Sequence, residues 1–218
     1  MSPDEGLVAY FGYGSLVNRA THRTEIVDAM PARLLGWRRS WCPPPTISAA
    51  SMALLSVRRM AGAGCDGLLV IDRAGNLAAV DRREARYRRV TLDPSEIECR
   101  GVLPDCEIYV YEVAAEPPAV ENPPAILRSY LDAVMQGFRV EHGETGLNRF
   151  VEETDGFHLH IHDDRAQPRY PRAVRIESHE AELFEAALAR RAGRVRPPDP
   201  TQASSSNVMM ETSPSSAP

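Results

Sequence analysis

Short apolar runs and glycine or proline breaks alternate along the first third of the chain. Residues 7–12 form a β-prone apolar run that ends in a glycine-punctuated segment, and residues 65–71 form another such run. Apolar runs of this length with Gly or Pro at their borders are typical of buried strands. The pattern predicts strands at 7–12, 33–42, 52–58 and 65–71.

The hydrophobic period changes further along the chain. Residues 87–92 and 106–113 have the composition and alternation of strands. From 126 to 138, apolar residues recur every three to four positions behind the start signal Pro123-Pro124, which predicts a helix. Weaker helical patterns cover 77–83, 143–153 and 181–192.

The order of these elements indicates the fold class. Strands dominate the first half and helices the second, which favours an α+β domain around an antiparallel or mixed sheet over a doubly wound fold. Residues 197–218 contain five Pro and six Ser and few residues able to join a core. We therefore predict one domain at 1–196 and a disordered tail at 197–218.

The balance of charges limits the classes of function. The chain carries 25 basic and 30 acidic residues, a formal net charge of -5, which argues against non-specific nucleic-acid binding. All the basic residues are arginine, so Schiff-base chemistry and a phosphate-binding P-loop, which both need lysine, are excluded. No nucleic-acid partner is predicted.

Targeting signals and cysteine usage indicate a cytoplasmic protein. No apolar stretch approaches the roughly 20 residues of a membrane span, and the N-terminal residues are acidic rather than basic. The four cysteines contain no C-x-x-C pair and are too sparse for a disulfide framework. We expect reduced thiols and no contact with a membrane.

The first candidate site is the segment 10–16, where the first predicted strand enters a loop. Gly12 and Gly14 stand at alternate positions, so successive backbone N–H groups could point in one direction and bind a carboxylate, a phosphate or an oxyanion. The alternative is a plain tight turn. A dinucleotide-binding fingerprint is excluded because its third glycine is replaced by Val17.

The second candidate is Glu84, which stands among five arginines in residues 81–89. Such a run is often a solvated charged surface whose ion pairs contribute little. The alternative makes Glu84 a general acid/base, with a pKa tuned by burial and a nearby cation. The local pattern leaves both interpretations open.

The third candidate is formed by His158, His160 and His162, which share one face if the segment is extended. Three ligands on one short strand rarely complete a tetrahedral zinc site without a distant partner. A polar strand face is therefore favoured over a metal site, and no metal is predicted. No serine lies in a G-x-S-x-G elbow and no cysteine has a local nucleophile signature.

The motifs taken together resemble the γ-glutamylcyclotransferase-like family. The resemblance rests on residues 11–16, on Glu84 in an Arg-Glu-x-x-Tyr-Arg context, and on the aromatic strand around Tyr109 and Tyr111. The motifs occur in the order found in the family, and the resemblance covers about residues 7–155. It implies a small mixed β-barrel flanked by helices, with a cavity at one mouth and no cofactor.

The resemblance also implies an activity and a site. The family converts a γ-glutamyl compound to 5-oxoproline and a free amine. The loop matching Tyr13, Gly14, Ser15 and Leu16 holds the γ-glutamyl group, and the residue matching Glu84 transfers protons. This chemistry fits the lack of a nucleophile motif, because the substrate's own α-amine attacks its γ-carbonyl.

Several points stay open at the level of sequence. The substrate is a γ-glutamyl amino acid, a γ-glutamyl amine or glutathione, and the oligomeric state is not predicted. Tyr130 lies on the apolar stripe of a predicted helix, so we interpret it as a core residue rather than a pocket residue. The competing function is a non-catalytic protein of the same fold that binds a small carboxylate or γ-glutamyl ligand.

Overall fold

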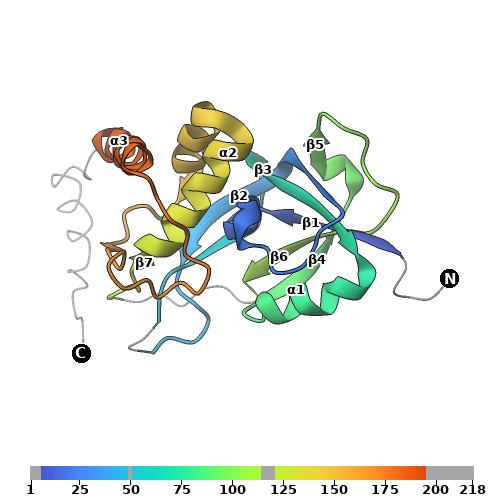
Figure 1. The fold of residues 1–218 in the computed structure, drawn as a ribbon, viewed down its shortest axis with the longest axis horizontal. Coiled ribbons are helices and arrows are strands. Elements are labelled where there is room, and N and C mark those ends of the chain that lie inside the picture. Colours follow the sequence, from blue (N-terminus) through green and yellow to red (C-terminus); the bar gives the residue numbers. More distant parts are fainter. Residues whose placement is uncertain (1–5, 49–50, 114–120, 195–218) are drawn as a thin grey trace, which may run out of the picture.

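A computed structural model describes residues 6–48, 51–113 and 121–194 (Figure 1). The predicted disordered tail at 197–218 and the domain boundary at 196 lie outside the described residues. In chain order the elements are β1 (Leu7–Gly12), β2 (Asp28–Cys42), β3 (Leu54–Arg73), α1 (Leu77–Arg83), β4 (Tyr87–Leu92), β5 (Ile97–Cys99), β6 (Ile108–Val113), β7 (Ile126–Leu127), α2 (Arg128–Glu152), β8 (Thr154–Asp155), β9 (Ile161–His162) and α3 (Ser178–Arg194).

The central sheet is mixed, as the α+β prediction requires. Its strands follow the order β4-β6-β1-β3-β2-β5, and β8 adds to β2. β1 runs parallel to β6 and antiparallel to β3, so β1 lies inside the sheet. Figure 1 shows α2 and α3 next to each other at one end of the sheet and α1 at another. The α+β class is therefore confirmed.

The small mixed β-barrel that the resemblance implies is not closed in the part of the chain that the structure describes. A barrel requires hydrogen bonds between its first and last strands. In this sheet, β4 pairs with β6 and β5 pairs with β2, and no pairing among the described strands joins β4 to β5. β5 covers only Ile97–Cys99, which leaves little backbone for closure. The sheet is open.

β3 corrects a second expectation. The predicted strands at 52–58 and 65–71 are parts of one continuous strand, and β2 pairs with both parts. The register between β2 and β3 shifts between Leu35 and Trp37. Gly62 has φ 74° in the stretch of β3 opposite this shift, a conformation that favours glycine. The glycines that indicated a break form a bulge within the strand instead.

The helices agree with the hydrophobic period. α1 and α3 confirm the predicted helices at 77–83 and 181–192. The predicted helix at 126–138 starts two residues too early, because Ile126 and Leu127 form β7; its remainder and the piece at 143–153 up to Glu152 belong to α2, which is interrupted at Gly143 (φ 67°, ψ -172°). Two helical segments therefore follow one another across a kink that a glycine permits.

The turn after β1 is the part of the fold that positions the site. Residues 8–11 of β1 are buried because β3 and β6 flank the strand. A 3-10 turn at Ser15–Val17 follows, and the Asn18 side chain next to it donates to the Ala133 carbonyl of α2 at 2.9 Å. A Cβ atom on Gly137 would lie 2.7 Å from the Asn18 backbone nitrogen. The glycine thus lets α2 pack closely over this turn.

The histidine segment does not form a long strand. His158, His160 and His162 are exposed, and β9 covers only Ile161–His162. Within the described ranges, no three His, Cys, Asp or Glu side chains are grouped to hold a metal ion.

The four cysteines are unpaired in the same part of the chain. No helix among the described residues is long and apolar enough to span a membrane.

Candidate functional site

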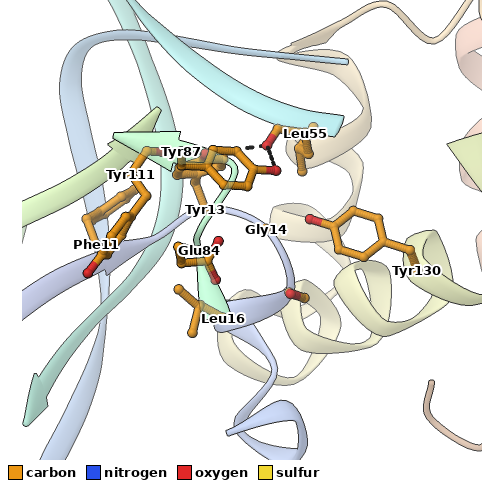
Figure 2. Close-up of a pocket in the computed structure, with 10 residues that line it drawn as sticks. Phe11, Tyr13, Gly14, Leu16, Leu55, Glu84, Tyr87, Tyr111 and Tyr130 are labelled. Carbon is orange, nitrogen blue, oxygen red and sulfur yellow. Dashed lines mark hydrogen bonds between the residues drawn. The ribbon is translucent and has the colours of Figure 1, made fainter. Parts of the chain in front are cut away.

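A narrow cavity of about 30 Å³ lies where β1 ends (Figure 2). Four tyrosines and one glutamate are among the residues that line it. The predicted residues Tyr13 to Leu16 and Glu84 all border it, although they come from separate parts of the chain. The complete lining consists of Phe11, Tyr13, Gly14, Ser15, Leu16, Leu55, Glu84, Tyr87, Tyr111 and Tyr130.

Tyr13 anchors the turn that forms one wall of the cavity. Its hydroxyl donates to the Tyr111 carbonyl at 2.5 Å, and its own carbonyl accepts from Arg39 Nη1 at 3.0 Å. Arg39 also donates to the Asp66 carbonyl at 2.9 Å. The Tyr13 ring and backbone therefore connect the turn to β6, β2 and β3, and fix where Gly14 begins.

Arg39 is a buried cation with an unusual environment. It is fully buried, and its guanidinium lies over the rings of Phe138 and Phe150 at 4.7 and 4.6 Å from their centroids. Its Nε donates to Thr154 Oγ1 at 2.8 Å. Burial lowers the pKa of the guanidinium. Among the described residues Arg39 forms no salt bridge, and carbonyl groups and aromatic faces surround its charge instead.

The two glycines of the turn are required by space. Gly14 has φ -123°, so the left-handed conformation is not the reason for glycine here. A Cβ atom on Gly14 would lie 2.7 Å from the Tyr130 hydroxyl, and one on Gly12 would lie 2.6 Å from Leu16 Cβ. Larger residues at either position would push into the cavity or deform the turn.

Ser15 lies between two polar side chains of the opposite walls. Its hydroxyl accepts from Arg83 Nη2 at 3.2 Å, and its backbone N–H donates to the Tyr130 hydroxyl. The Ser15 carbonyl accepts from Thr21 Oγ1 at 2.7 Å. The serine hydroxyl thus helps to hold an arginine.

Glu84 occupies the corner between α1 and β4. Its N–H bonds to the Val80 carbonyl at 2.9 Å and its carbonyl accepts from Tyr87 N–H at 2.8 Å, which closes the helix and starts the strand. The side chain, 16% exposed, points toward the turn across the cavity (Figure 2). Burial raises the pKa of the Glu84 carboxyl, while the charges of Arg83 and Arg172 act in the opposite direction. Such a carboxyl is suited to exchange protons.

Arg83 differs from the other arginines of residues 81–89 because its side chain contacts Glu84 and is largely buried. Its Nε lies 3.1 Å from a Glu84 carboxylate oxygen, and its side chain is only 10% exposed. Its two Nη atoms donate to Ser15 Oγ and to both oxygens of Thr21, the carbonyl and the hydroxyl. The remaining arginines of the run are exposed, as the solvated-surface interpretation expects: Arg82, Arg86, Arg88 and Arg89.

Sequence reasoning missed most of the aromatic lining. Tyr130 was interpreted as a core residue, and its ring does pack edge-on against Trp41 at 5.7 Å between centroids. Its hydroxyl, however, borders the cavity beside Gly14. Burial raises the pKa of Tyr130, so the hydroxyl stays protonated near neutral pH. Tyr87 donates to the Leu55 carbonyl at 3.2 Å.

Comparison with known proteins gives structural similarity without sequence similarity. No protein-family profile and no curated protein matches the chain. A solved structure described as a gamma-glutamyl cyclotransferase superposes with a TM-score of 0.51 at 14% identity, covering 83% of this chain and 99% of that one. The chain has the γ-glutamyl cyclotransferase-like fold. The fold implied by the resemblance is thereby confirmed, apart from the closed barrel.

A second structure of the same fold adds no functional information. The crystal structure of YkqA from Bacillus subtilis matches with a TM-score of 0.50 at 20% identity. The match covers 71% of this chain and 58% of YkqA. Identities this low show the fold alone, so the activity has to be argued from the site.

Proposed function

We propose that this protein is a γ-glutamylcyclotransferase-type enzyme that converts a γ-glutamyl compound to 5-oxoproline and a free amine. A γ-glutamyl amino acid, a γ-glutamyl amine or glutathione is the substrate. The observation that carries the proposal is Glu84, a largely buried carboxyl with a raised pKa that faces the Tyr13–Leu16 turn across a cavity. The fold supports it, because a gamma-glutamyl cyclotransferase has the same fold.

The reaction needs no nucleophile from the protein. The substrate's α-amine attacks its own γ-carbonyl carbon, a C–N bond forms, and the original γ-amide C–N bond breaks. Glu84 takes a proton from the α-ammonium and delivers it to the departing nitrogen, so the carboxylate is regenerated after each turnover; the second proton that the attacking nitrogen loses as it becomes the lactam N–H goes to the released amine, which leaves as an ammonium. The protein's main contribution is to hold the γ-glutamyl chain folded back on itself.

The turn and Tyr130 supply the polar groups for this task. Gly14 lacks a side chain, so the Tyr130 hydroxyl lies directly against the backbone of the turn, and both border the cavity. The protonated Tyr130 hydroxyl is a donor beside the same backbone. We assign to these groups the stabilisation of negative charge that develops on the γ-carbonyl oxygen.

The first experiment is a product assay. Purified protein is incubated with glutathione, with γ-glutamyl amino acids and with γ-glutamyl amines, and 5-oxoproline and the free amine are measured together. We expect equal amounts of both products from at least one class. Absence of 5-oxoproline from every class would contradict the proposal. Binding without turnover would favour the non-catalytic alternative.

A further inference from the structure

The segment between β9 and α3 is held firmly against α2. Asp164 accepts from the Ser129 N–H at 2.7 Å and from the Ser129 hydroxyl at 2.6 Å. Arg165 forms an ion pair with Asp132 at 2.7 Å. These contacts join the segment to the first turns of α2, so the residues that follow have fixed positions.

This segment places two side chains next to residues that line the cavity, although neither is itself part of the lining. The Tyr170 ring packs edge-on against Tyr130, with centroids 4.9 Å apart. Arg172 lies close enough to Glu84 for its positive charge to lower the pKa of that carboxyl. Because Tyr130 and Glu84 both line the cavity, residues 170–172 lie beside it.

The two cations that act on Glu84 differ in their partners. Arg83 bonds to Glu84, Ser15 and Thr21, so its donors are used within the protein. The Arg172 Nε is buried and has no hydrogen-bond partner in the part of the chain that the structure describes. Among the described ion pairs closer than 4.0 Å, none involves Arg172. A buried donor without a partner is costly, so a site of this kind is a candidate for an acceptor from a ligand.

The chemistry of the proposed substrate requires such a donor near Glu84. The α-carbon of a γ-glutamyl group carries both an ammonium and a carboxylate. If Glu84 takes the ammonium's proton, the carboxylate on the same carbon has to lie within a few bond lengths of Glu84. Two carboxylates so close repel each other unless a cation lies beside them.

We propose that Arg172 binds the α-carboxylate of the γ-glutamyl group and so determines the specificity of the enzyme for γ-glutamyl compounds. The inference rests on the proposed function. The negative charge of Glu84 then faces the ammonium of the substrate, and the positive charge of Arg172 faces its α-carboxylate. Compounds that lack this carboxylate leave Arg172 unpaired and bind poorly.

Two analogues of γ-glutamyl-alanine each lack one of the two groups on the α-carbon, the carboxylate or the amine. 4-Aminobutyryl-alanine keeps the amine and lacks the carboxylate, and it can still cyclise to 2-pyrrolidinone with release of alanine. Glutaryl-alanine keeps the carboxylate, lacks the amine and cannot cyclise, so calorimetry measures its binding alone. γ-Glutamyl-alanine, which has both groups, is the reference.

The test compares Arg172→Gln and Arg172→Lys with the parent. We expect the parent to prefer γ-glutamyl-alanine over 4-aminobutyryl-alanine by about 10- to 100-fold in kcat/KM, the effect of a charge-assisted hydrogen bond. R172Q should lose most of this preference through KM and bind glutaryl-alanine more weakly by a similar factor. R172K, which keeps the charge, should recover part of both.

Arg175→Gln is the matched control, since Arg175 lies in the same segment and its side chain is 90% exposed. It should retain the parent's preference. An R172Q variant that discriminates as the parent does, while the parent is active, overturns the role of Arg172 and leaves the proposed function intact. A parent that binds glutaryl-alanine without turnover overturns the proposed function only. A parent that does neither overturns both.

Discussion

The two walls of the cavity differ in how they are encoded. One wall consists of the Tyr13–Leu16 turn and Glu84. Both are short sequence motifs, and each directly follows a secondary-structure element, β1 or α1. The other wall is formed by Tyr130 on α2, which Tyr170 contacts from outside the lining, and it depends on packing between segments far apart in the sequence. In the proposed reaction the first wall carries the proton-transfer residue Glu84, and the second wall adds the hydroxyl of Tyr130.

The largest effect on stability is expected at Arg39, which supports the first wall from beneath. Arg39→Met would leave the Tyr13 and Asp66 carbonyls without their buried donor. Each such loss costs about 1–3 kcal/mol, so we expect a loss of about 2–4 kcal/mol in the free energy of unfolding. Urea unfolding measures this. A variant as stable as the parent would contradict the role of Arg39 in holding the turn.

Gly14 tests the contact between the two walls. Gly14→Val would bring a side chain against the Tyr130 hydroxyl, which lies 2.7 Å from the ideal Cβ position. Either Tyr130 or the turn has to move to make room, so glutaryl-alanine should bind at least about tenfold more weakly.

Ser15→Ala is the matched change in the same turn, because it removes one hydrogen bond, to Arg83, and adds no atoms. It should weaken binding less than Gly14→Val does, by about tenfold at most. Circular dichroism confirms that both variants are folded. If Ser15→Ala were the more damaging, the hydroxyl itself would be a ligand or a reactive group.

Tyr130 tests the second wall by itself. Tyr130→Phe keeps the ring contacts with Trp41 and Tyr170 and removes the hydroxyl. We expect kcat for γ-glutamyl-alanine to fall about fivefold to tenfold, the value of one hydrogen bond, with little change in stability. An unchanged kcat would leave Tyr130 a packing residue.

The extent to which the sequence predicted the molecule follows the same division. The turn at 13–16 and Glu84 stand out in local patterns that leave simpler interpretations open, and only the family resemblance assigns them roles. Arg83 was indistinguishable from its exposed neighbours, because only the direction of α1 turns it inward. The hydroxyl of Tyr130 faces the cavity although its ring obeys the apolar period of α2, and periodicity does not separate the two ends of one side chain.

Local sequence patterns also do not determine whether β3 is one continuous strand or whether the sheet closes into a barrel. Glycines near Gly62 indicate a break, but pairing with β2 on both sides of the bulge keeps β3 a single strand. Barrel closure depends on whether two edges meet, which is a property of the whole sheet. The short β5, paired with β2 alone, decides it.

The smallest expected effect concerns pH and stability. Since burial raises the Glu84 pKa in the folded state, folding binds protons between the unfolded and folded pKa values. The parent's stability therefore falls as the pH rises through this window, and Glu84→Gln lacks this loss. The melting temperature of E84Q relative to the parent should increase from pH 4 to pH 7. A constant difference would mean that the Glu84 pKa is not raised.

The same variant tests the central claim most directly, through turnover of γ-glutamyl-alanine and binding of glutaryl-alanine measured side by side. General acid/base catalysis contributes about 10²- to 10⁴-fold, so 5-oxoproline formation by E84Q should fall by that factor while glutaryl-alanine binds within a few-fold of the parent. Glu98→Gln, an exposed glutamate on β5, is the control and should leave both quantities unchanged. Turnover by E84Q within about tenfold of the parent would contradict the assignment of Glu84 as the acid/base.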